Sequence, residues 1–223
     1  MNVAQDRSVK NLQELYTVAV GVALATAIAR VVDTGAGQFP FRARALPVFF
    51  ALLVILVPFY HGTMRHLDVT YVEEGGRGVL RGALLADFFL LFLEACLLFA
   101  AAQLLDRTWY AGWVIAIALL FDALWGIVVH MALSKVRRWT RQSGWILINL
   151  IFGPTLMILL VVTEDCRPDG NLSLTAALVF MSLAIVRTAI DYTISWNFYY
   201  PGWGGPATAP KEPEHEPPAA VAG

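Results

Sequence analysis

Charged side chains are scarce in this sequence. Only 15% of its 223 residues are Asp, Glu, Lys or Arg, whereas an average soluble domain carries about a quarter. Because charged groups keep the surface of a soluble protein hydrated, this scarcity argues against an ordinary water-soluble globular domain. Apolar residues are abundant instead: 58% belong to the hydrophobic set, and the mean hydropathy is +0.62. Such a composition favours a chain whose surface faces lipid.

Cysteine and lysine are also rare. The two cysteines, Cys96 and Cys166, lie in an apolar run and in a short polar segment. They are therefore expected at different depths, too far apart for a disulfide, and Cys96 is interpreted as a small apolar packing residue. No lysine lies deep in a long apolar run, which argues against a retinal Schiff base of the rhodopsin type.

Familiar catalytic and metal-binding motifs are missing. Neither H-E-x-x-H nor G-x-S-x-G occurs, and the glycine-rich residues 75–78 lack the Lys-Ser/Thr ending of a phosphate loop. A segment rich in histidine and acid matches no standard metal spacing and is interpreted as a solvated juxtamembrane loop. It comprises His61, His66, Asp68, Glu73 and Glu74. The sequence therefore predicts no metal site, gives no support for an enzyme and, with a net charge of -1, predicts no nucleic-acid partner.

Six apolar segments approach or exceed the length of about 20 residues that a helix needs to cross a bilayer. They lie at residues 12–32, 45–60, 83–105, 110–133, 145–162 and 172–199. The sequence thus predicts an all-α fold, a polytopic integral membrane protein with six transmembrane helices in a bundle within residues 1–200. The second segment is short, so it either ends near residue 60 or extends past His61 towards His66. Residues 201–223, rich in Pro, Ala and Glu, are predicted to form a disordered cytoplasmic tail.

The distribution of basic residues predicts the orientation of the chain. Arg and Lys are more numerous in the segments on the side of both termini, with the densest cluster at Lys135, Arg137, Arg138 and Arg141. Cytoplasmic loops carry such an excess, so both termini are predicted in the cytoplasm. A composition rich in alanine and arginine favours a multi-pass protein of the plasma membrane, specifically a bacterial inner membrane.

Small residues recur on the first apolar segment. Ala19, Ala23 and Ala27 are spaced four apart, and small residues allow membrane helices to approach closely. Packing within one chain is the favoured interpretation, and self-association through this face is the alternative. The lipid bilayer is one expected partner, and a second copy of the chain or another membrane protein is the other candidate.

The most informative residues are ionisable and lie inside the predicted spans. Such groups are costly in a bilayer and usually face protein or a water-filled cavity. Counting along the helices places Glu94, Asp122 and Arg187 in a central layer. A shallower layer on the cytoplasmic side holds Asp87, Asp191, His61, His130 and Asn149. Because four carboxyls accompany the single obligate cation Arg187, we expect at least one of them, Glu94, to carry a proton at neutral pH.

Two classes of function agree with this pattern. In the first, the protein moves protons, ions or a small solute along a polar pathway formed by Asp87, Glu94, Asp122, Arg187 and Asp191, to which His61, His130 and Asn149 contribute. In the second, the same residues join the helices of a non-catalytic accessory, sensor or effector subunit. The cofactor is unknown. His61 and His130 lie on different predicted helices near the same membrane face, and two such histidines are enough to ligate a haem iron axially. The favoured interpretation is that both are ordinary histidines at the membrane interface.

Overall fold

A computed structural model describes residues 3–32, 41–73, 82–133, 143–163 and 170–201 of the chain. The predicted tail, the segment with Cys166 and the side chain of His130 lie outside the described residues. The described part is all-helical, as predicted, and contains six helices long and apolar enough to span a membrane. They are α1 (Val3–Val31), α2 (Ala45–Leu67), α3 (Ala83–Gln103), α4 (Thr108–Leu133), α5 (Ser143–Val162) and α6 (Leu174–Tyr199), and a π-helical turn, η1 (Asp68–Glu73), follows α2.

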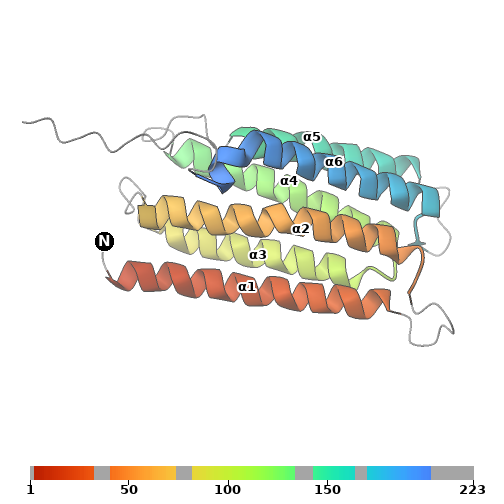
Figure 1. The fold of residues 1–223 in the computed structure, drawn as a ribbon, viewed down its shortest axis with the longest axis horizontal. Coiled ribbons are helices and arrows are strands. Elements are labelled where there is room, and N and C mark those ends of the chain that lie inside the picture. The colour runs from red at the N-terminus through yellow and green to blue at the C-terminus, as the bar shows by residue number, and fades with distance from the viewer. Residues whose placement is uncertain (1–2, 33–40, 74–81, 134–142, 164–169, 202–223) are drawn as a thin grey trace, which may run out of the picture.

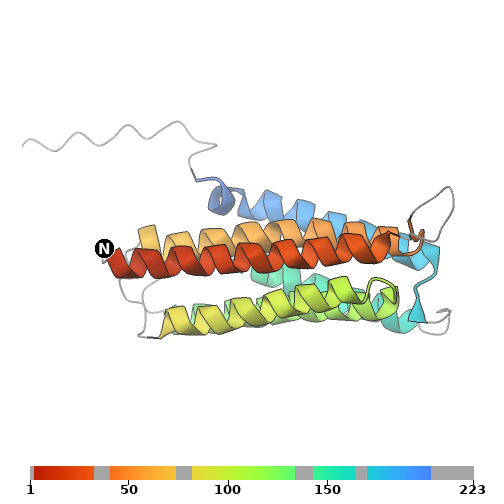
Figure 2. The same cartoon turned by 90° about the horizontal axis from the view of Figure 1, so that it is seen from below.

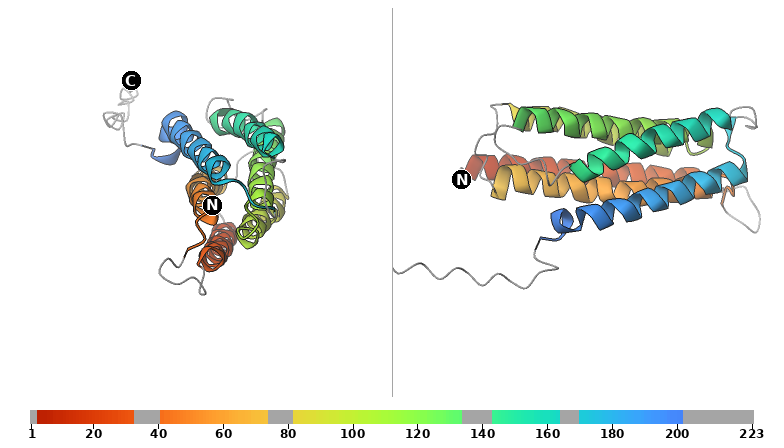
Figure 3. Two further views of the ribbon diagram at one scale, coloured as in Figure 1. Left: turned by 90° about the vertical axis from the view of Figure 1, so that its right-hand side faces the viewer. Right: turned by 90° about the horizontal axis from the view of Figure 1, so that it is seen from above.

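The six helices run side by side in two layers (Figures 1 and 2). One layer holds α1, α2 and α6, and the other holds α3, α4 and α5 (Figure 3). The closest packing joins α1 to α3, α2 to α6 and α4 to α5, whereas α2 touches α3 and α4 only sparsely. The start of α1 and the end of α6 lie at the same end of the bundle, called the termini end below (Figure 1).

Helix α2 continues well beyond residue 60, so residues 61–73 are helical and do not form the expected juxtamembrane loop. The continuation has a buried face. Phe59, Thr63, Leu67 and Tyr71, each one turn from the next, are all buried. A helix whose apolar face packs against its neighbours gains stability along that whole face. The buried face of α2 and η1 therefore stabilises both elements as far as the termini end.

Pro58 lies inside α2 and shapes its contact with α6. Proline has no N–H to donate, so the carbonyl four residues earlier loses its helical partner. That carbonyl belongs to Val54, and the hydroxyl of Thr188 on α6 donates to it at 3.0 Å. A hydrogen bond between helices thus replaces the one that the proline removes.

Replacing Thr188 with valine is expected to lower the free energy of unfolding by about 1 kcal/mol, because the Val54 carbonyl loses its donor. The measurement is unfolding by SDS in mixed micelles, followed by circular dichroism. Thr193→Val is the matched control, since the exposed Thr193 hydroxyl bonds only to Ala189 of its own helix. Equal losses in both variants would contradict a special role for the proline-freed carbonyl.

The half of the bundle opposite the termini end has an apolar core. Ala23 and Ala27 of α1 are fully buried in it, which confirms the predicted packing of small residues within the chain. Cys96, by contrast, is exposed on the outer surface of the bundle. Its interpretation as an internal packing residue is wrong, because the inward face of α3 at this level is formed by Glu94, Ala95 and Leu98.

Candidate functional site

Arg187 on α6 is the centre of the largest polar cluster. Its side chain is 2% exposed, and each guanidinium nitrogen faces an oxygen. Nε and Nη2 donate to the Oδ1 of Asn149 at 3.1 and 2.7 Å, and Nη1 forms an ion pair with the Oδ2 of Asp191 at 3.2 Å. The guanidinium also lies over the ring of Phe59, 5.7 Å from its centroid. The buried cation is therefore neutralised by Asp191, although its Nη1 donates no hydrogen bond within the described residues.

Asn149 connects this cation to a carboxyl on a third helix. While its Oδ1 accepts from Arg187, its Nδ2 donates to the Oδ2 of Asp122 at 2.5 Å. The half-buried Asp122 belongs to α4 and Asn149 to α5, so one amide side chain links α4, α5 and α6. Asp191 closes the other side of the cluster by accepting from the hydroxyls of Ser195 and Tyr199, each at 3.2 Å.

Glu94 on α3 has a single hydrogen-bond donor among the described residues. The hydroxyl of Tyr16 on α1 donates to its Oε1 at 2.5 Å, and Glu94 itself is 3% exposed. Tyr16 was absent from the predicted site. Tyrosine is common in membrane helices, and no spacing rule links residues that are 78 positions apart. The bond joins the two helix layers through a buried carboxyl.

Asp87 on α3 forms a second, smaller cluster nearer the termini end. Its Oδ2 accepts from the hydroxyl of Tyr71 at 2.6 Å and lies 3.3 Å from the Nε2 of His66. Both partners come from the helical continuation of α2 that the sequence analysis assigned to a loop. The regular spacing of buried residues along 59–71 was the signal that could have placed His66 and Tyr71 inside the bundle.

A pocket lies between the two helix layers and joins these clusters. Its cavity volume is about 50 Å³. Its polar lining includes Glu94, Asp122, Arg187 and Asp191, and His66 lies on the α2 side. The remaining lining is Pro58, Phe59, Gly62, Thr63, Leu91, Trp125, Gly126, Trp145, Phe198 and Tyr199.

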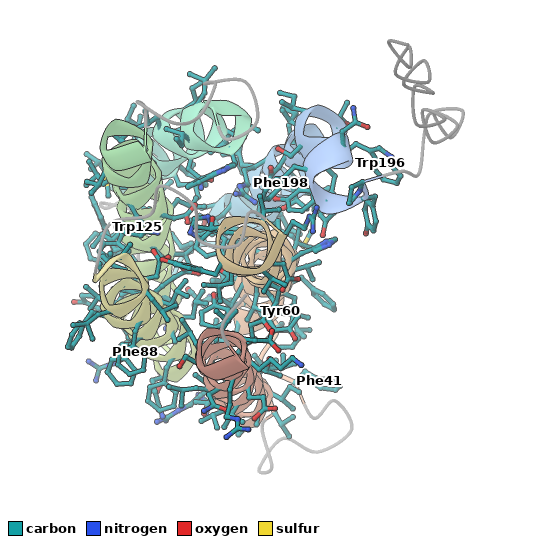
Figure 4. All side chains as sticks on the ribbon, turned by 90° about the vertical axis from the view of Figure 1, so that its left-hand side faces the viewer. Phe41, Tyr60, Phe88, Trp125, Trp196 and Phe198 are labelled. Carbon is teal, nitrogen blue, oxygen red and sulfur yellow. The ribbon has the colours of Figure 1, made fainter. Side chains whose placement is uncertain are left out.

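The pocket extends towards only one end of the bundle. Trp145 near the start of α5 and Phe198 near the end of α6 line it, and Figure 4 looks along the bundle onto this termini end, with Trp125 and Phe198 labelled on the two layers. In the opposite direction the core consists of tightly packed apolar side chains. They include Leu52, Ile55, Leu98, Leu119, Leu156 and Phe180.

The structure does not bring His61 into the buried network. Its ring packs against Tyr192, Tyr199 and Tyr200, with centroids 4.7–6.1 Å apart, and its Nδ1 lies 3.3 Å from the hydroxyl of Tyr192. It lines a separate, open groove together with residues of α1. The side chain of His130 lies outside the described residues, so the haem hypothesis gains no geometric support.

Comparisons of the chain with models of protein families, with curated proteins and with solved structures find no match. The class of protein is therefore defined by its own fold and site. The described part of the chain forms a bundle of six helices that are long and apolar enough to span a membrane. Ionisable side chains surround a pocket between the two layers of this bundle.

Proposed function

We propose that this chain is a multi-pass protein of the plasma membrane that moves protons, alone or together with an ion or a small solute, through the pocket between its layers. The observation that carries the proposal is the pocket itself. It joins Glu94, Asp122 and Arg187, near the middle of three helices, to the helix ends at the termini end. Ionisable groups inside membrane helices that face a cavity usually mark a transport path.

The outer surface of the bundle supports its insertion in lipid. Large apolar side chains are exposed along the helices, among them Phe89, Ile158, Val162 and Val18, and soluble monomers rarely expose apolar surface on this scale. The excess of Lys and Arg in the segments at the termini end favours a cytoplasmic location for both termini. The pocket then opens to the cytoplasm, and a bacterial inner membrane fits the composition.

The apolar core beyond the pocket favours a carrier over an open channel. Leu98, Leu119 and Phe180 are fully buried in this core, so packed apolar side chains lie between the pocket and the opposite end in the part of the chain that the structure describes. Transport then requires the two layers to separate at that end while they close at the termini end. The packing of α2 against α3 and α4 is sparse, whereas α1 packs closely on α3 across the layers, so such a movement opens the centre of the bundle more easily than the α1–α3 edge.

Purified protein in liposomes is expected to dissipate an imposed pH gradient, and Glu94→Gln is expected to lower this flux at least about tenfold, because an amide neither accepts nor releases a proton at neutral pH. The substitution keeps an oxygen that can accept from Tyr16, so the fold should be retained. Flux is followed with a trapped pH-sensitive dye, with and without a membrane potential.

The matched control is Asp106→Asn, the same chemical change at the opposite end of the bundle, where Asp106 pairs with the exposed Arg30 at 3.8 Å. This variant should retain wild-type flux. Wild-type flux no greater than that of protein-free liposomes, under a pH gradient and under a voltage, would contradict proton movement.

One observation favours the alternative, an accessory, sensor or effector subunit with a structural polar core. Every buried carboxyl of the network has a hydrogen-bond donor: Tyr16 for Glu94, Tyr71 for Asp87, Asn149 for Asp122, and Ser195 and Tyr199 for Asp191. Satisfied networks of this kind join membrane helices. Under this alternative, Glu94→Gln changes stability without changing any flux.

A further inference from the structure

We infer that the solute of this pocket is a small organic cation, which binds between Glu94 and Asp122 in exchange for a proton. The inference rests on the proposed function and names the chemical class of its solute. Its basis is the combination of two carboxyls that form no ion pair within the described residues, an arginine already paired with Asp191, and aromatic walls around one cavity.

The two carboxyls lack a cationic partner. Glu94 accepts one hydrogen bond from Tyr16, and Asp122 accepts one from Asn149. Within the described residues neither forms an ion pair, although both line the same pocket. A buried carboxylate is strongly disfavoured unless a proton or a cation neutralises it. The charge of the pocket therefore favours a cation.

Arg187 does not make the pocket a site for anions. Its three nitrogens face Asn149 and Asp191, and the ring of Phe59 covers the guanidinium. An anionic solute would have to displace these partners. With its carboxyls ionised, the lining holds more negative than positive groups, because Glu94, Asp122 and Asp191 accompany Arg187 and the histidine His66.

The aromatic lining specifies an organic cation rather than a hydrated metal ion. Rings from four helices contribute to the walls: Phe59, Trp125, Trp145, Phe198 and Tyr199. Aromatic faces attract cations and bind alkylated ammonium groups well, with tryptophan the strongest partner. A small alkali ion would instead need a complete shell of oxygen ligands. The carboxyls of the lining supply some oxygens, but among the described residues no three metal-ligating side chains are placed to hold one ion.

The exchange balances in charge. A carboxyl of Glu94 or Asp122 releases its proton to water at the open end of the pocket, and the cation then occupies the place of that proton. Other ionisable groups near this exchange come from several helices. They are Tyr16 on α1, His66 on α2, Asp87 on α3, and Arg187, Asp191 and Tyr199 on α6, while α5 contributes the neutral Trp145 and Asn149.

The probe for the test is trimethylphenylammonium, with the full chain in nanodiscs of zwitterionic lipid and binding measured by equilibrium dialysis. We expect saturable binding that Glu94→Gln and Asp122→Asn each weaken at least about tenfold. Asp106→Asn should bind as the wild type does. Because a proton competes for the same carboxyl, the apparent Kd should rise by up to about tenfold for each unit that the pH falls once the carboxyl is protonated.

Three results would overturn the inference. They are no saturable binding by the folded wild type, binding by both carboxyl variants that is as tight as that of the wild type, and displacement of the probe by the neutral isostere tert-butylbenzene. Trp125→Leu provides an independent variant in case the carboxyl variants fail to fold. It should weaken the binding of the cation while the pH dependence persists.

A cysteine at Thr63 separates failure of this inference from failure of the proposed function. Thr63 lines the pocket and is buried, and Leu98 in the apolar core provides the control. In a background without native cysteines, Thr63→Cys should react with a small water-soluble thiol reagent and Leu98→Cys should not. Reaction at Thr63 without binding of the probe contradicts only the organic cation, whereas no reaction at Thr63 contradicts both proposals.

Discussion

Replacing Arg187 with methionine is expected to lower the free energy of unfolding by about 3–5 kcal/mol. The substitution leaves Asp191, 1% exposed, without the ion pair that joins it to Arg187 at 3.2 Å. It also removes both donors to the Oδ1 of Asn149. Methionine occupies a similar volume, so the loss comes from an unpaired buried charge and an unpaired amide rather than from a cavity.

The effect can be measured by SDS unfolding in mixed micelles, with Arg30→Met as the control. Arg30 also pairs with an aspartate, Asp106, but its side chain is 44% exposed and the two groups lie 3.8 Å apart. Exposed pairs contribute about 0–1 kcal/mol, so this variant should remain close to the wild type.

A second substitution identifies the cause of the loss. Asp191→Asn in the Arg187→Met background removes the unpaired charge and should recover part of the lost stability. If the double variant is as unstable as Arg187→Met alone, the buried charge is not the source, and the hydrogen bonds to Asn149 carry the whole effect.

Residues close together in sequence account for most of what could be predicted. Asp87 and Glu94 are seven residues apart, nearly two helical turns, which places them on one face of α3, and both are 3% exposed inside the bundle. Arg187 and Asp191 are one turn apart on α6, and they form an ion pair. Helical periodicity fixes such relations within a segment, just as hydropathy locates the segments themselves.

Relations between helices could not be predicted in the same way. Tyr16 and Glu94 lie 78 positions apart, and Arg187 and Asn149 lie 38 apart. Which faces meet depends on how α1 packs on α3 and α5 on α6, and a single sequence contains no periodic signal for that choice. His61 illustrates the result: its expected depth was near the network, yet its ring faces a different groove.

Two ends were possible for α2, and the structure agrees with the longer one, which extends past His61. Arg65, His66 and Asp68 interrupt the apolar run, and such residues usually mark the edge of a span. In the bundle each of them finds a partner: Phe198 O for Arg65, Asp87 for His66 and Gln13 for Asp68. Polar side chains that are satisfied by neighbouring helices do not end a helix, so hydropathy alone underestimates its length.

The polar contacts also explain how two layers with a sparse central interface stay together. Bonds from Tyr16 to Glu94, from Tyr71 to Asp87 and from Arg187 to Asn149 all cross between the layers. A proposed carrier must break some of these bonds when it changes conformation. Protonation of a carboxyl, or occupation of the pocket by a cation, changes the strength of bonds to the same groups.

Replacing Gly126 with alanine is expected to destabilise the fold by about 1–3 kcal/mol and to weaken binding in the pocket. A Cβ on this residue of α4 would overlap the ring of Trp145 and lie 2.6 Å from the Cγ1 of Ile146, both on α5. The two helices must then move apart, or the rigid indole ring must move. Overpacking of this kind typically costs about 1–3 kcal/mol, and Trp145 lines the pocket.

Gly21→Ala is the matched control for this prediction. Gly21 also lies within a helix, but a Cβ there meets nothing within 4 Å. Alanine favours a helix over glycine by about 0.5–1 kcal/mol, so this variant should be as stable as the wild type or more so.

Adding Trp145→Leu to Gly126→Ala should restore part of the stability while cation binding stays weak, because the space returns but the aromatic wall does not. Recovery of both stability and cation binding would show that the indole ring takes no part in binding. Recovery of neither would show that Gly126 is needed for the close approach of the α4 and α5 backbones, rather than to leave space for the ring.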